Sequence, residues 1–410
     1  MKHVYTSIDI GSDSIKVVAC ELFKNKLNLL AASSVKSKGI KKGLITDPEA
    51  ASASLRMAMD EIQQMLGVAI KKVIVSIPSY FADFTIVKGR LAFADENHII
   101  NSEDIVNVIE NAIGSKIGPL NEMVTVLPID FSLDGKTESV IDPKGMLGTT
   151  LSTRAIMITT PKKNVYSVVS LVSSLGIEVI DISINGIGDI YALKDSSFDE
   201  KVGALINIGA ETTSVSIYNK GIIVKSSILP MGGYNIDSDI AYIYKMSIES
   251  ARKLKEKFAL AHKIYAQTND IVDVIDNVGE VIKINQYEIS DISMLRIREI
   301  LENAKKEIMV LTNRQIDYII VTGGVSNMTH FEYVVSDVFG KVATVGNINL
   351  IGIRNNKYST AIGNVVYFIS KLKLKGKDYS MFNQSDVEQL SLTRKSATMV
   401  GKVFSFFFNE

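Results

Sequence analysis

Two segments, about half a chain apart, repeat one pattern of a strand, a glycine turn and a returning strand. Residues 4–10 and 15–20 are the predicted strands of the first hairpin, and residues 203–208 and 214–218 are those of the second. Glycine lets the backbone turn sharply with its N–H groups directed inward, and hydroxyl side chains add further donors. Two such hairpins that face each other can hold a polyphosphate from both sides. The residues that supply this chemistry are Asp9, Gly11, Ser12, Asp13 and Ser14 in the first hairpin, and Asn207, Gly209, Ala210, Glu211, Thr212 and Thr213 in the second.

A carboxylate and a third glycine turn complete the candidate site. Asp9 is placed to orient a magnesium ion through water. A short apolar strand, residues 318–321, leads into Gly323, Gly324 and Val325, and a helical pattern follows over residues 328–339. A Gly-Gly turn between strand and helix lets a ligand approach the backbone, and the N-terminus of the helix favours negative charge. Neither hairpin continues into the GxxxxGK[ST] motif and helix of a Walker loop.

The order hairpin, hairpin, strand-turn-helix resembles the actin, Hsp70 and hexokinase superfamily, whose nucleotide lies between two related lobes. The resemblance implies that Asp9, Gly11, Ser12 and Lys16 surround the β- and γ-phosphates of ATP. It implies that Lys255 and Glu256, within the charged run 252–257, contact adenosine. A solvated helix face is the alternative for that run. Gly232 and Gly233 belong to the implied nucleotide-binding set, and residues 359–363 are similar to the second hinge segment between the lobes.

The composition is compatible with a soluble two-lobed protein and excludes several other classes. The chain has 410 residues with 45 basic and 45 acidic side chains, so its net charge of zero predicts no nucleic-acid partner. Cys20 is the sole cysteine, which rules out a disulfide within the chain and favours a cytosolic setting. The four histidines have no metal-ligand spacing. No apolar run approaches the roughly 18 residues that cross a bilayer.

The middle of the chain departs from actin. After an amphipathic helix over residues 50–67 and a strand over 73–77, an insert of strands (84–87, 123–126, 129–132 and 153–159) and one helix (102–113, with Ser102 as N-cap) is predicted. This arrangement resembles the cell division protein FtsA family, which replaces one actin subdomain with an unrelated one at this place. Two short segments look like that family's sequence, Val75-Ser76-Ile77-Pro78 before the insert and Gly145-Met146-Leu147-Gly148 within it.

The C-terminus favours the same family. Residues 375–392 are polar and are predicted to form a flexible linker, and residues 393–410 give a helix with a basic polar face and an aromatic apolar remainder. Such a helix must dock on its own domain, on a partner or in a membrane interface. The cationic face favours anionic membrane lipids, and FtsA proteins end in a similar helix. The predicted membrane residues are Arg394, Lys395, Met399, Val400, Lys402, Val403, Phe404, Phe406, Phe407 and Phe408.

The resemblance implies an α/β, actin-like two-lobed ATPase fold with an inserted small α+β subdomain and a C-terminal amphipathic helix. The expected divisions are lobe 1 (residues 1–82 and 161–202), the insert (83–160), lobe 2 (203–230 and 316–374), the outer subdomain of lobe 2 (231–315), the linker (375–392) and the membrane helix (393–410). We expect ATP and Mg²⁺ as ligands of the cleft.

The implied function is that of a membrane tether for the division ring, at the cytoplasmic face of the cell membrane. Members of the family polymerise into actin-like filaments, bind the C-terminal peptide of FtsZ and recruit later division proteins, here through the insert. Arg296 and Glu299 look like the peptide-binding residues of the outer subdomain, although Arg and Glu at this spacing also form ordinary surface ion pairs.

The sequence predicts weak ATP hydrolysis at most, with no catalytic residue assigned. Asn185 stands near the place where hydrolytic relatives carry an acid or Gln that positions the attacking water, and Asn cannot act as a base. Asn207 replaces the usual Asp of the second loop. ATP is therefore expected to act mainly as a ligand that closes the lobes and favours polymerisation.

Two other functions of the same superfamily stay open. A sugar or small-molecule kinase would need a catalytic Asp after Pro78 and a substrate pocket, for which no candidate stands out. A pilus-assembly ATPase carries a similar insert but in general lacks the membrane helix.

Overall fold

Two five-stranded sheets of the same design form the centre of the molecule. The computed structural model describes residues 2–114 and 117–397. The strand orders are β10-β6-β1-β2-β3 and β13-β12-β11-β16-β17. The first sheet contains β1 (His3–Ile10), β2 (Ser14–Phe23), β3 (Lys26–Lys36), β6 (Lys72–Ile77) and β10 (Glu178–Ile184). The second contains β11 (Val202–Ile208), β12 (Thr213–Asn219), β13 (Ile222–Leu229), β16 (Tyr318–Thr322) and β17 (Ala343–Val345).

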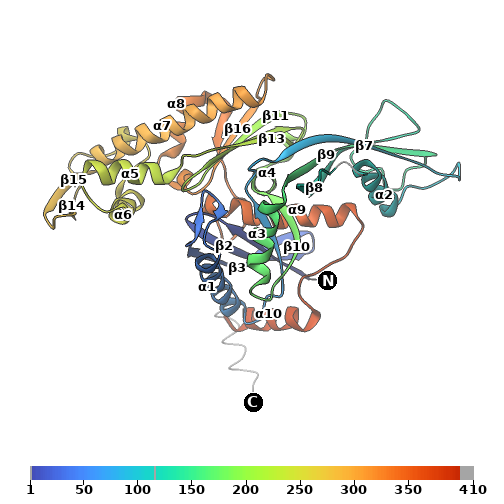
Figure 1. Cartoon of the computed structure of the whole chain (residues 1–410), viewed down its shortest axis with the longest axis horizontal. Coiled ribbons are helices and arrows are strands. Elements are labelled where there is room, and N and C mark those ends of the chain that lie inside the picture. Colours follow the sequence, from blue (N-terminus) through green and yellow to red (C-terminus); the bar gives the residue numbers. More distant parts are fainter. Residues whose placement is uncertain (1, 115–116, 398–410) are drawn as a thin grey trace, which may run out of the picture.

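The pairing within the two sheets is also the same. β1 pairs antiparallel with β2 and parallel with β6, and β11 pairs antiparallel with β12 and parallel with β16. The repeated glycine hairpin of the sequence is thus one part of a repeated half-molecule. Because parallel strands end at a common edge, the residues that follow β1, β6, β11 and β16 gather at the carboxyl ends of the two sheets. We call the two sheets with their covering helices lobe 1 and lobe 2 (Figure 1).

Helices cover the sheets and connect the lobes. In lobe 1 these are α1 (Pro48–Leu66), α3 (Lys162–Ser173), α4 (Asn185–Leu193) and α9 (Ser359–Leu374), beside the short strands β4 (Ile40–Lys41) and β5 (Leu44–Ile45). The predicted helix over residues 50–67 is α1, which begins earlier than expected. The carboxylate of Asp47 accepts hydrogen bonds from the N–H groups of Glu49 and Ala50, both at 3.1 Å, and Pro48 suits the first turn.

The connecting helices α4 and α9 pack with almost no space between their backbones. A Cβ atom added at Gly363 would lie 1.6 Å from the carbonyl oxygen of Gly188, and one added at Gly188 would lie 2.5 Å from the carbonyl oxygen of Thr360. Any side chain at either position must therefore push the helices apart. This contact fixes where the N-terminal ends of both helices lie.

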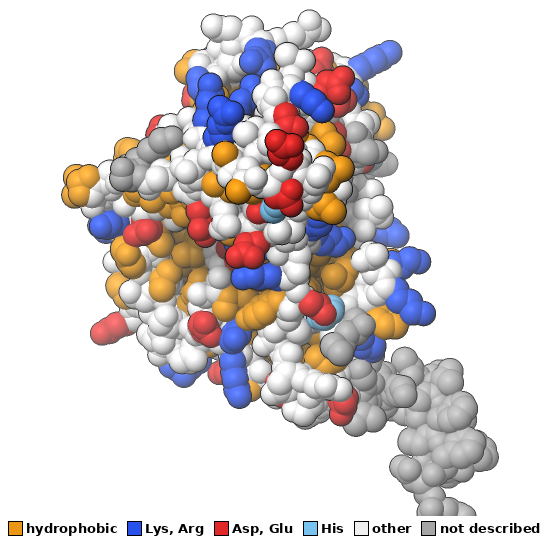
Figure 2. All heavy atoms as spheres, turned by 90° about the vertical axis from the view of Figure 1, so that its right-hand side faces the viewer, with side chains coloured by type: hydrophobic (Ala, Val, Ile, Leu, Met, Phe, Trp, Pro, Cys, Tyr) orange, Lys and Arg blue, Asp and Glu red, His pale blue; other side chains and the backbone are white. Residues whose placement is uncertain are grey.

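The insert is a three-stranded sheet with one helix, in the predicted β-α-β-β order. It contains β7 (Asp83–Ala92), α2 (Ser102–Ile113), β8 (Asn121–Leu133) and β9 (Thr150–Pro161), with β9 in the centre. The two strands expected over residues 123–126 and 129–132 form the single strand β8, interrupted by irregularities near Met123 and Pro128. Figure 2 faces this side of the molecule and shows basic, acidic and hydrophobic side chains interspersed.

The predicted N-cap of the insert's helix is wrong by one residue. Asn101, not Ser102, caps α2: its side-chain oxygen accepts from the N–H of Glu103 at 2.7 Å and from that of Asp104 at 3.2 Å. The Asp104 carboxylate accepts in return from the Asn101 N–H at 2.9 Å. A reciprocal capping box needs the acidic residue three positions after the cap, which only Asn101 satisfies.

The outer part of lobe 2 is mostly helical. It comprises α5 (Gly233–Ile243), α6 (Ile248–Phe258), the hairpin β14 (Ile271–Ile275) and β15 (Val281–Asn285), and the long helix α7 (Gln286–Leu311). The helical pattern expected over residues 328–339 is shorter in the structure: α8 (Phe331–Phe339) follows a single 3-10 turn over Val325–Asn327.

The segment expected to be a flexible linker is partly packed on lobe 1. The N–H of Met381 bonds to the Val4 carbonyl at 3.1 Å, and Met381 and Phe382 are buried. A helix, α10 (Gln384–Ala397), follows. Two apolar residues are enough to anchor this polar stretch. The average composition of the stretch does not reveal them. Within the described residues no helix could cross a bilayer. Residues 398–410, with most of the predicted membrane helix, lie outside the described part.

Candidate functional site

The first hairpin places a charged pair at the start of its turn. Asp9 and Lys16 face each other across β1 and β2, and the Lys16 ammonium lies 3.0 Å from the Asp9 carboxylate, both largely buried. The Gly11 N–H donates to the Ser14 carbonyl at 3.2 Å and closes the turn. The Ser12 hydroxyl accepts from the Gly43 N–H at 2.8 Å, so the loop before β5 (Leu44–Ile45) holds this turn in place.

The second hairpin is closed in the same way and is backed by a pair of glycines. The Gly209 N–H donates to the Thr212 carbonyl at 2.9 Å, and the Gly233 N–H donates to the Gly209 carbonyl at 2.9 Å. A Cβ atom added at Gly232 would lie 2.5 Å from that same Gly209 carbonyl. The Thr213 hydroxyl donates to the Met231 carbonyl at 2.8 Å. We call the turn of the first hairpin (residues 11–13) loop 1 and the turn of the second (residues 209–212) loop 2. Loop 2 thus rests on the N-terminus of α5, and the predicted residues Ala210 to Thr213 lie together with Gly232 and Gly233.

The third glycine turn lies against the end of β11. Gly323 has a φ of +97°, and a Cβ atom there would lie 2.4 Å from the Asn207 side-chain oxygen and 2.4 Å from the Ile208 carbonyl. Only glycine fits this conformation and this spacing. Gly324 precedes the 3-10 turn that contains Val325. The structure therefore brings the second and third predicted turns into direct contact.

A buried aspartate that the sequence reasoning missed joins the parts of the site. Asp189, in α4, accepts hydrogen bonds from the Asn207 amide and from the hydroxyls of Ser359 and Thr360, each at 2.7 Å. Burial raises the pKa of Asp189 to about 6, the three hydrogen bonds oppose the shift, and the nearby charge of Asp9 adds to it. Its signal in the sequence was a single acid within an otherwise apolar helix.

Asn185 is the first residue of α4, as the hinge interpretation requires. Its side-chain oxygen is buried and has no hydrogen-bond partner among the described residues. A buried carbonyl oxygen without a partner is costly unless water or a ligand bonds to it. This atom is therefore able to accept a hydrogen bond from a water molecule.

Direct contacts cross from lobe 1 to lobe 2 at the mouth of the cleft. Asp13 of loop 1 forms an ion pair with Arg252 of α6, and the Lys42 N–H donates to the Glu211 carboxylate at 2.5 Å. Burial alone would raise the pKa of Asp13, but the hydrogen bond and charge of Arg252 bring it below its ordinary value. The Ser79 and Ser226 hydroxyls meet at 2.8 Å. These contacts join the two lobes directly.

A pocket of about 330 Å³ lies at this junction, between loop 1 and β3 on one side and α6 on the other. Its walls carry both charges. They are formed by Asp13, Ser14, Ser34, Lys36, Glu249, Arg252, Lys253, Glu256 and Lys357. Burial and the charge of Lys16 lower the pKa of Lys357.

The two residues expected to contact adenosine point to different places. Glu256 lines this pocket and accepts from Arg252 at 2.9 Å. The Lys255 ammonium is instead buried within the outer part of lobe 2, at 2.6 Å from the Asp237 carboxylate. Lys255 thus supports the packing of α6 on α5 in this arrangement.

Arg296 and Glu299 lie together on α7, away from the cleft. The Arg296 guanidinium donates to both oxygens of Asp239, at 2.6 and 2.8 Å, and to Glu299 at 2.6 Å. Arg298, on the neighbouring face of the helix, pairs with Asp337 at 2.9 Å. The expected peptide-binding arginine is thus held in a fixed geometry by α5.

Asp189 makes the stability of the closed fold depend on pH. Its pKa of about 6 lies above the ordinary value of 3.8, so its contribution is fully present below about pH 4 and is lost as pH rises through 6. The loss is on the order of 2–3 kcal/mol. Asp189→Asn removes the ionisation, so urea-unfolding midpoints should shift in favour of the variant between about pH 4.5 and pH 7. Parallel pH profiles of the two proteins would contradict this assignment.

The fold has neighbours among solved structures that are remote in sequence. One chain of a PilM–PilN type IV pilus biogenesis complex superposes with a TM-score of 0.59 at 12% identity, covering 88% of this chain and 98% of that chain. MreB 5 of Spiroplasma citri, solved bound to AMPPNP, gives a TM-score of 0.56 at 14% identity, covering 91% and 99%. At such identities the likeness establishes the actin-like fold alone.

Sequence comparison is more specific. A family model described as cell division protein FtsA matches residues 204–363, and one described as SHS2 domain inserted in FTSA matches residues 83–159. Cell division protein FtsA of Bacillus subtilis is 30% identical over 380 residues, covering 91% of this chain and 85% of that protein. FtsA of Streptococcus pneumoniae is 28% identical, covering 87% and 78%. The expected resemblance is confirmed: this chain belongs to the family of the cell division protein FtsA.

Proposed function

We propose that this protein binds ATP between its lobes, polymerises on the cytoplasmic face of the cell membrane and tethers the division ring there. One observation carries the nucleotide part of the proposal. The two hairpins of a duplicated fold lie near one buried aspartate, Asp189, which accepts a hydrogen bond from Asn207 of the second hairpin and whose pKa is also raised by the charge of Asp9 of the first. Positions 11, 232 and 323 are glycines, where a Cβ atom would lie 2.4 to 2.8 Å from a neighbouring atom. A phosphate group can come close to backbone N–H groups where glycine carries no side chain. The family and its AMPPNP-bound structural neighbour favour a nucleoside triphosphate.

Magnesium fits this site only as part of a metal–nucleotide complex. Within the described residues, no three His, Cys, Asp or Glu side chains are grouped to hold a metal ion. Mg²⁺ commonly takes several ligands from water and from substrate phosphates. Asp9 would then order the water shell, and Lys16 would neutralise phosphate charge beside it. When bound, Mg²⁺ supplies charge neutralisation at the β- and γ-phosphates.

We infer that hydrolysis is slow. The side chain at position 207 donates its amide hydrogen to Asp189, a role that a carboxylate could not fill without placing two buried negative charges at hydrogen-bonding distance. Asn185 can accept from a water molecule but cannot remove its proton. ATP therefore serves to close the lobes and to favour filaments.

The partners proposed here are the C-terminal peptide of FtsZ, further copies of this chain, anionic membrane lipids and later division proteins. Arg296 and Glu299 contribute to the peptide-binding surface of the outer part of lobe 2. The later division proteins contact the insert, where Ile99, Ile141 and Leu147 expose more than half of their side-chain surface. A pilus-assembly function or a kinase activity has no comparable support, because the sequence relatives are cell division proteins.

Gly11→Val should weaken ATP binding by roughly tenfold or more, which corresponds to 1.4 kcal/mol. The new Cβ would lie 2.8 Å from the Lys16 ammonium nitrogen and 3.0 Å from the Ser14 carbonyl, so it displaces the cation that faces phosphate. Titration calorimetry with Mg-ATP measures the change. Gly118→Val is the matched control, because its Cβ would meet nothing within 4 Å. If both variants bound Mg-ATP with equal affinity, the proposal that ATP binds between the lobes would be contradicted.

Arg296→Glu should abolish binding of the FtsZ C-terminal peptide. The variant would gather three carboxylates with Asp239 and Glu299 and remove the guanidinium from the proposed peptide-binding surface. Fluorescence anisotropy with a labelled peptide reports the affinity. Arg298→Glu, two residues away on another helix face, should bind nearly as well as the wild type, and a similar loss in both variants would argue against a local contact.

Phe407→Glu should release the protein from anionic vesicles while ATP binding persists. Partial burial of Phe404, Phe407 and Phe408 contributes about 1.5 kcal/mol each at the lower end of the usual range, and nearby cations add about 1 kcal/mol each, which salt weakens. Filaments multiply such weak anchors. Co-sedimentation at low and high salt measures the release. Phe81→Glu, at a side chain that is 83% exposed on lobe 1, is the control. Undiminished sedimentation of Phe407→Glu would end the tether proposal.

A further inference from the structure

The outer face of helix α1 carries two exposed methionines among the exposed polar residues Arg56, Asp60, Glu61 and Gln64. Its inner face is buried in lobe 1 through residues such as Leu55, Met59 and Ile62. On the opposite side Met57 is 62% exposed and Met65 is 50% exposed. These two methionines lie eight positions apart, so both fall on the outer side of the helix. Two large exposed apolar side chains on one side of the helix point to a docking surface.

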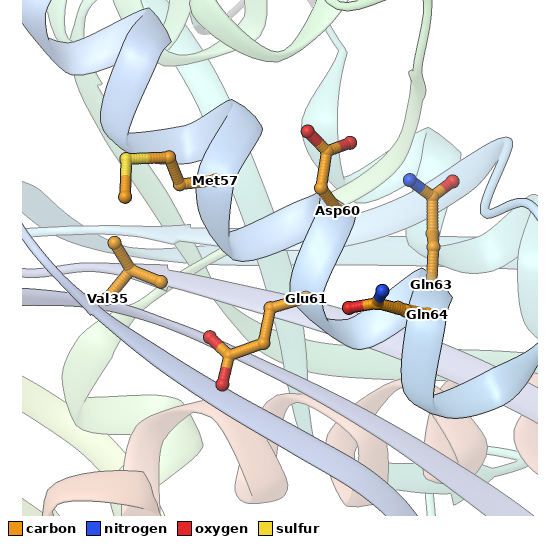
Figure 3. Close-up of a pocket in the computed structure, with 6 residues that line it drawn as sticks. All are labelled: Val35, Met57, Asp60, Glu61, Gln63 and Gln64. Atoms are coloured by element: carbon orange, nitrogen blue, oxygen red, sulfur yellow. The ribbon is translucent and has the colours of Figure 1, made fainter.

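A shallow, open groove lies beside Met57. It has a volume of about 550 Å³ and is lined by Val35 of β3 and by Met57, Asp60, Glu61, Gln63 and Gln64 of α1. In Figure 3 the ends of the Met57 and Val35 side chains point toward each other, and the Glu61 carboxylate lies on the same side of the helix. We call this surface the α1 groove.

The walls of the α1 groove are fixed by hydrogen bonds to the body of lobe 1. The Glu61 carboxylate accepts from the Ser33 hydroxyl of β3 at 2.8 Å. The Gln63 side chain accepts from the Ile70 N–H at 2.8 Å. The groove thus combines a fixed acidic edge with the adaptable side chain of Met57, and methionine packs well against aromatic rings.

The C-terminal chain passes beside the end of α1. Gln389 of α10 donates to the carbonyl of Gly67, the residue that caps α1, at 2.9 Å, and Leu390 is buried. Figure 1 shows α10 beneath this end of α1. From Gly67 back to Met57 is about 15 Å of helix, and residues 398–410 would span about 20 Å as a helix. A helix of residues 398–410 would therefore be at least as long as the stretch of α1 from Gly67 to Met57.

The chemistry of the terminal segment complements the groove. Residues 398–410 carry Met399, Val400, Val403 and four phenylalanines on their apolar side. Lys402 adds a cation where the groove offers the carboxylates of Asp60 and Glu61. If the phenylalanine rings packed on Met57 and Val35, the apolar side chains of the segment and of the groove would both be removed from water. Lys402 would then lie beside the acidic edge.

We propose that residues 398–410 dock in the α1 groove of their own chain when no membrane is present. The same apolar side chains then serve two exclusive contacts, the groove and the lipid surface. Docking shields the phenylalanines in solution and lowers the apparent affinity for lipid, so that an anionic surface must displace the segment from the groove. The docking itself stands apart from the proposed function, whereas the competition rests on the membrane role proposed above.

Cysteine cross-linking of the full chain tests the docking. Cys20 is buried, and a Met57→Cys, Phe404→Cys variant adds one thiol at an exposed position of the α1 groove and one in the terminal segment. A short bismaleimide should join them within one chain in solution, and anionic vesicles should reduce the yield severalfold. Met309→Cys with Phe404→Cys is the control, since Met309 on α7 is also 62% exposed. No cross-link above this control, or a product found only between two chains, would overturn docking within the chain.

A charge substitution in the groove supplies a second test. The proposal predicts that it increases the vesicle-bound fraction, whereas electrostatic repulsion alone would decrease it. Met57→Glu should eject the segment and raise the vesicle-bound fraction severalfold at limiting lipid, although added negative charge by itself weakens binding to anionic lipid. Met309→Glu should leave binding unchanged or weaker. An unchanged or lower bound fraction for Met57→Glu would contradict the competition. A cross-link that forms in solution and persists with vesicles would leave the docking in place and count against the tether.

Discussion

The contact between α4 and α9 is the constraint on which the rest of the molecule depends. Gly188 and Gly363 bring the two backbones so close that no side chain fits between them. The N-terminal ends of both helices then converge, which places Asp189 within hydrogen-bonding distance of Ser359 and Thr360. Asp189 in turn holds the amide of Asn207 at the end of β11. One tight helix crossing thus sets the position of loop 2 relative to lobe 1.

This arrangement explains the polar residues of the cleft as one connected system. Lys16 neutralises Asp9, Asn207 donates to Asp189, and Arg252 reaches across to Asp13. The two buried carboxylates Asp9 and Asp189 therefore have different partners. A ligand with negative charge in the cleft would compete for the same cations. Of these pairs, Arg252–Asp13 joins the two lobes, so a ligand that displaced it would release one contact between them.

The C-terminal region links the body of the protein to its surroundings. Met381 and Phe382 fix the chain on lobe 1, and Gln389 fixes α10 at the end of α1. α10 therefore lies at the edge of lobe 1 that carries the end of α1. The position of that edge, on the side of lobe 1 away from α7, separates the proposed lipid contact from the proposed peptide contact (Figure 1).

The sequence by itself determined the features that depend on neighbouring residues. Glycine turns between strands, the β-α-β-β order of the insert and the apolar stripe of α1 each follow from backbone freedom or side-chain period over a few positions. The family resemblance followed from the order of these local signals. The tertiary structure alone decided which polar groups meet. Asp189 bonds Thr360 across 171 positions of the chain, and Asp13 pairs with Arg252 across 239. Lys255 pairs with Asp237, and the predicted linker contains the buried residues Met381 and Phe382. Neither was predicted, because burial and pairing depend on distant elements that no local pattern specifies.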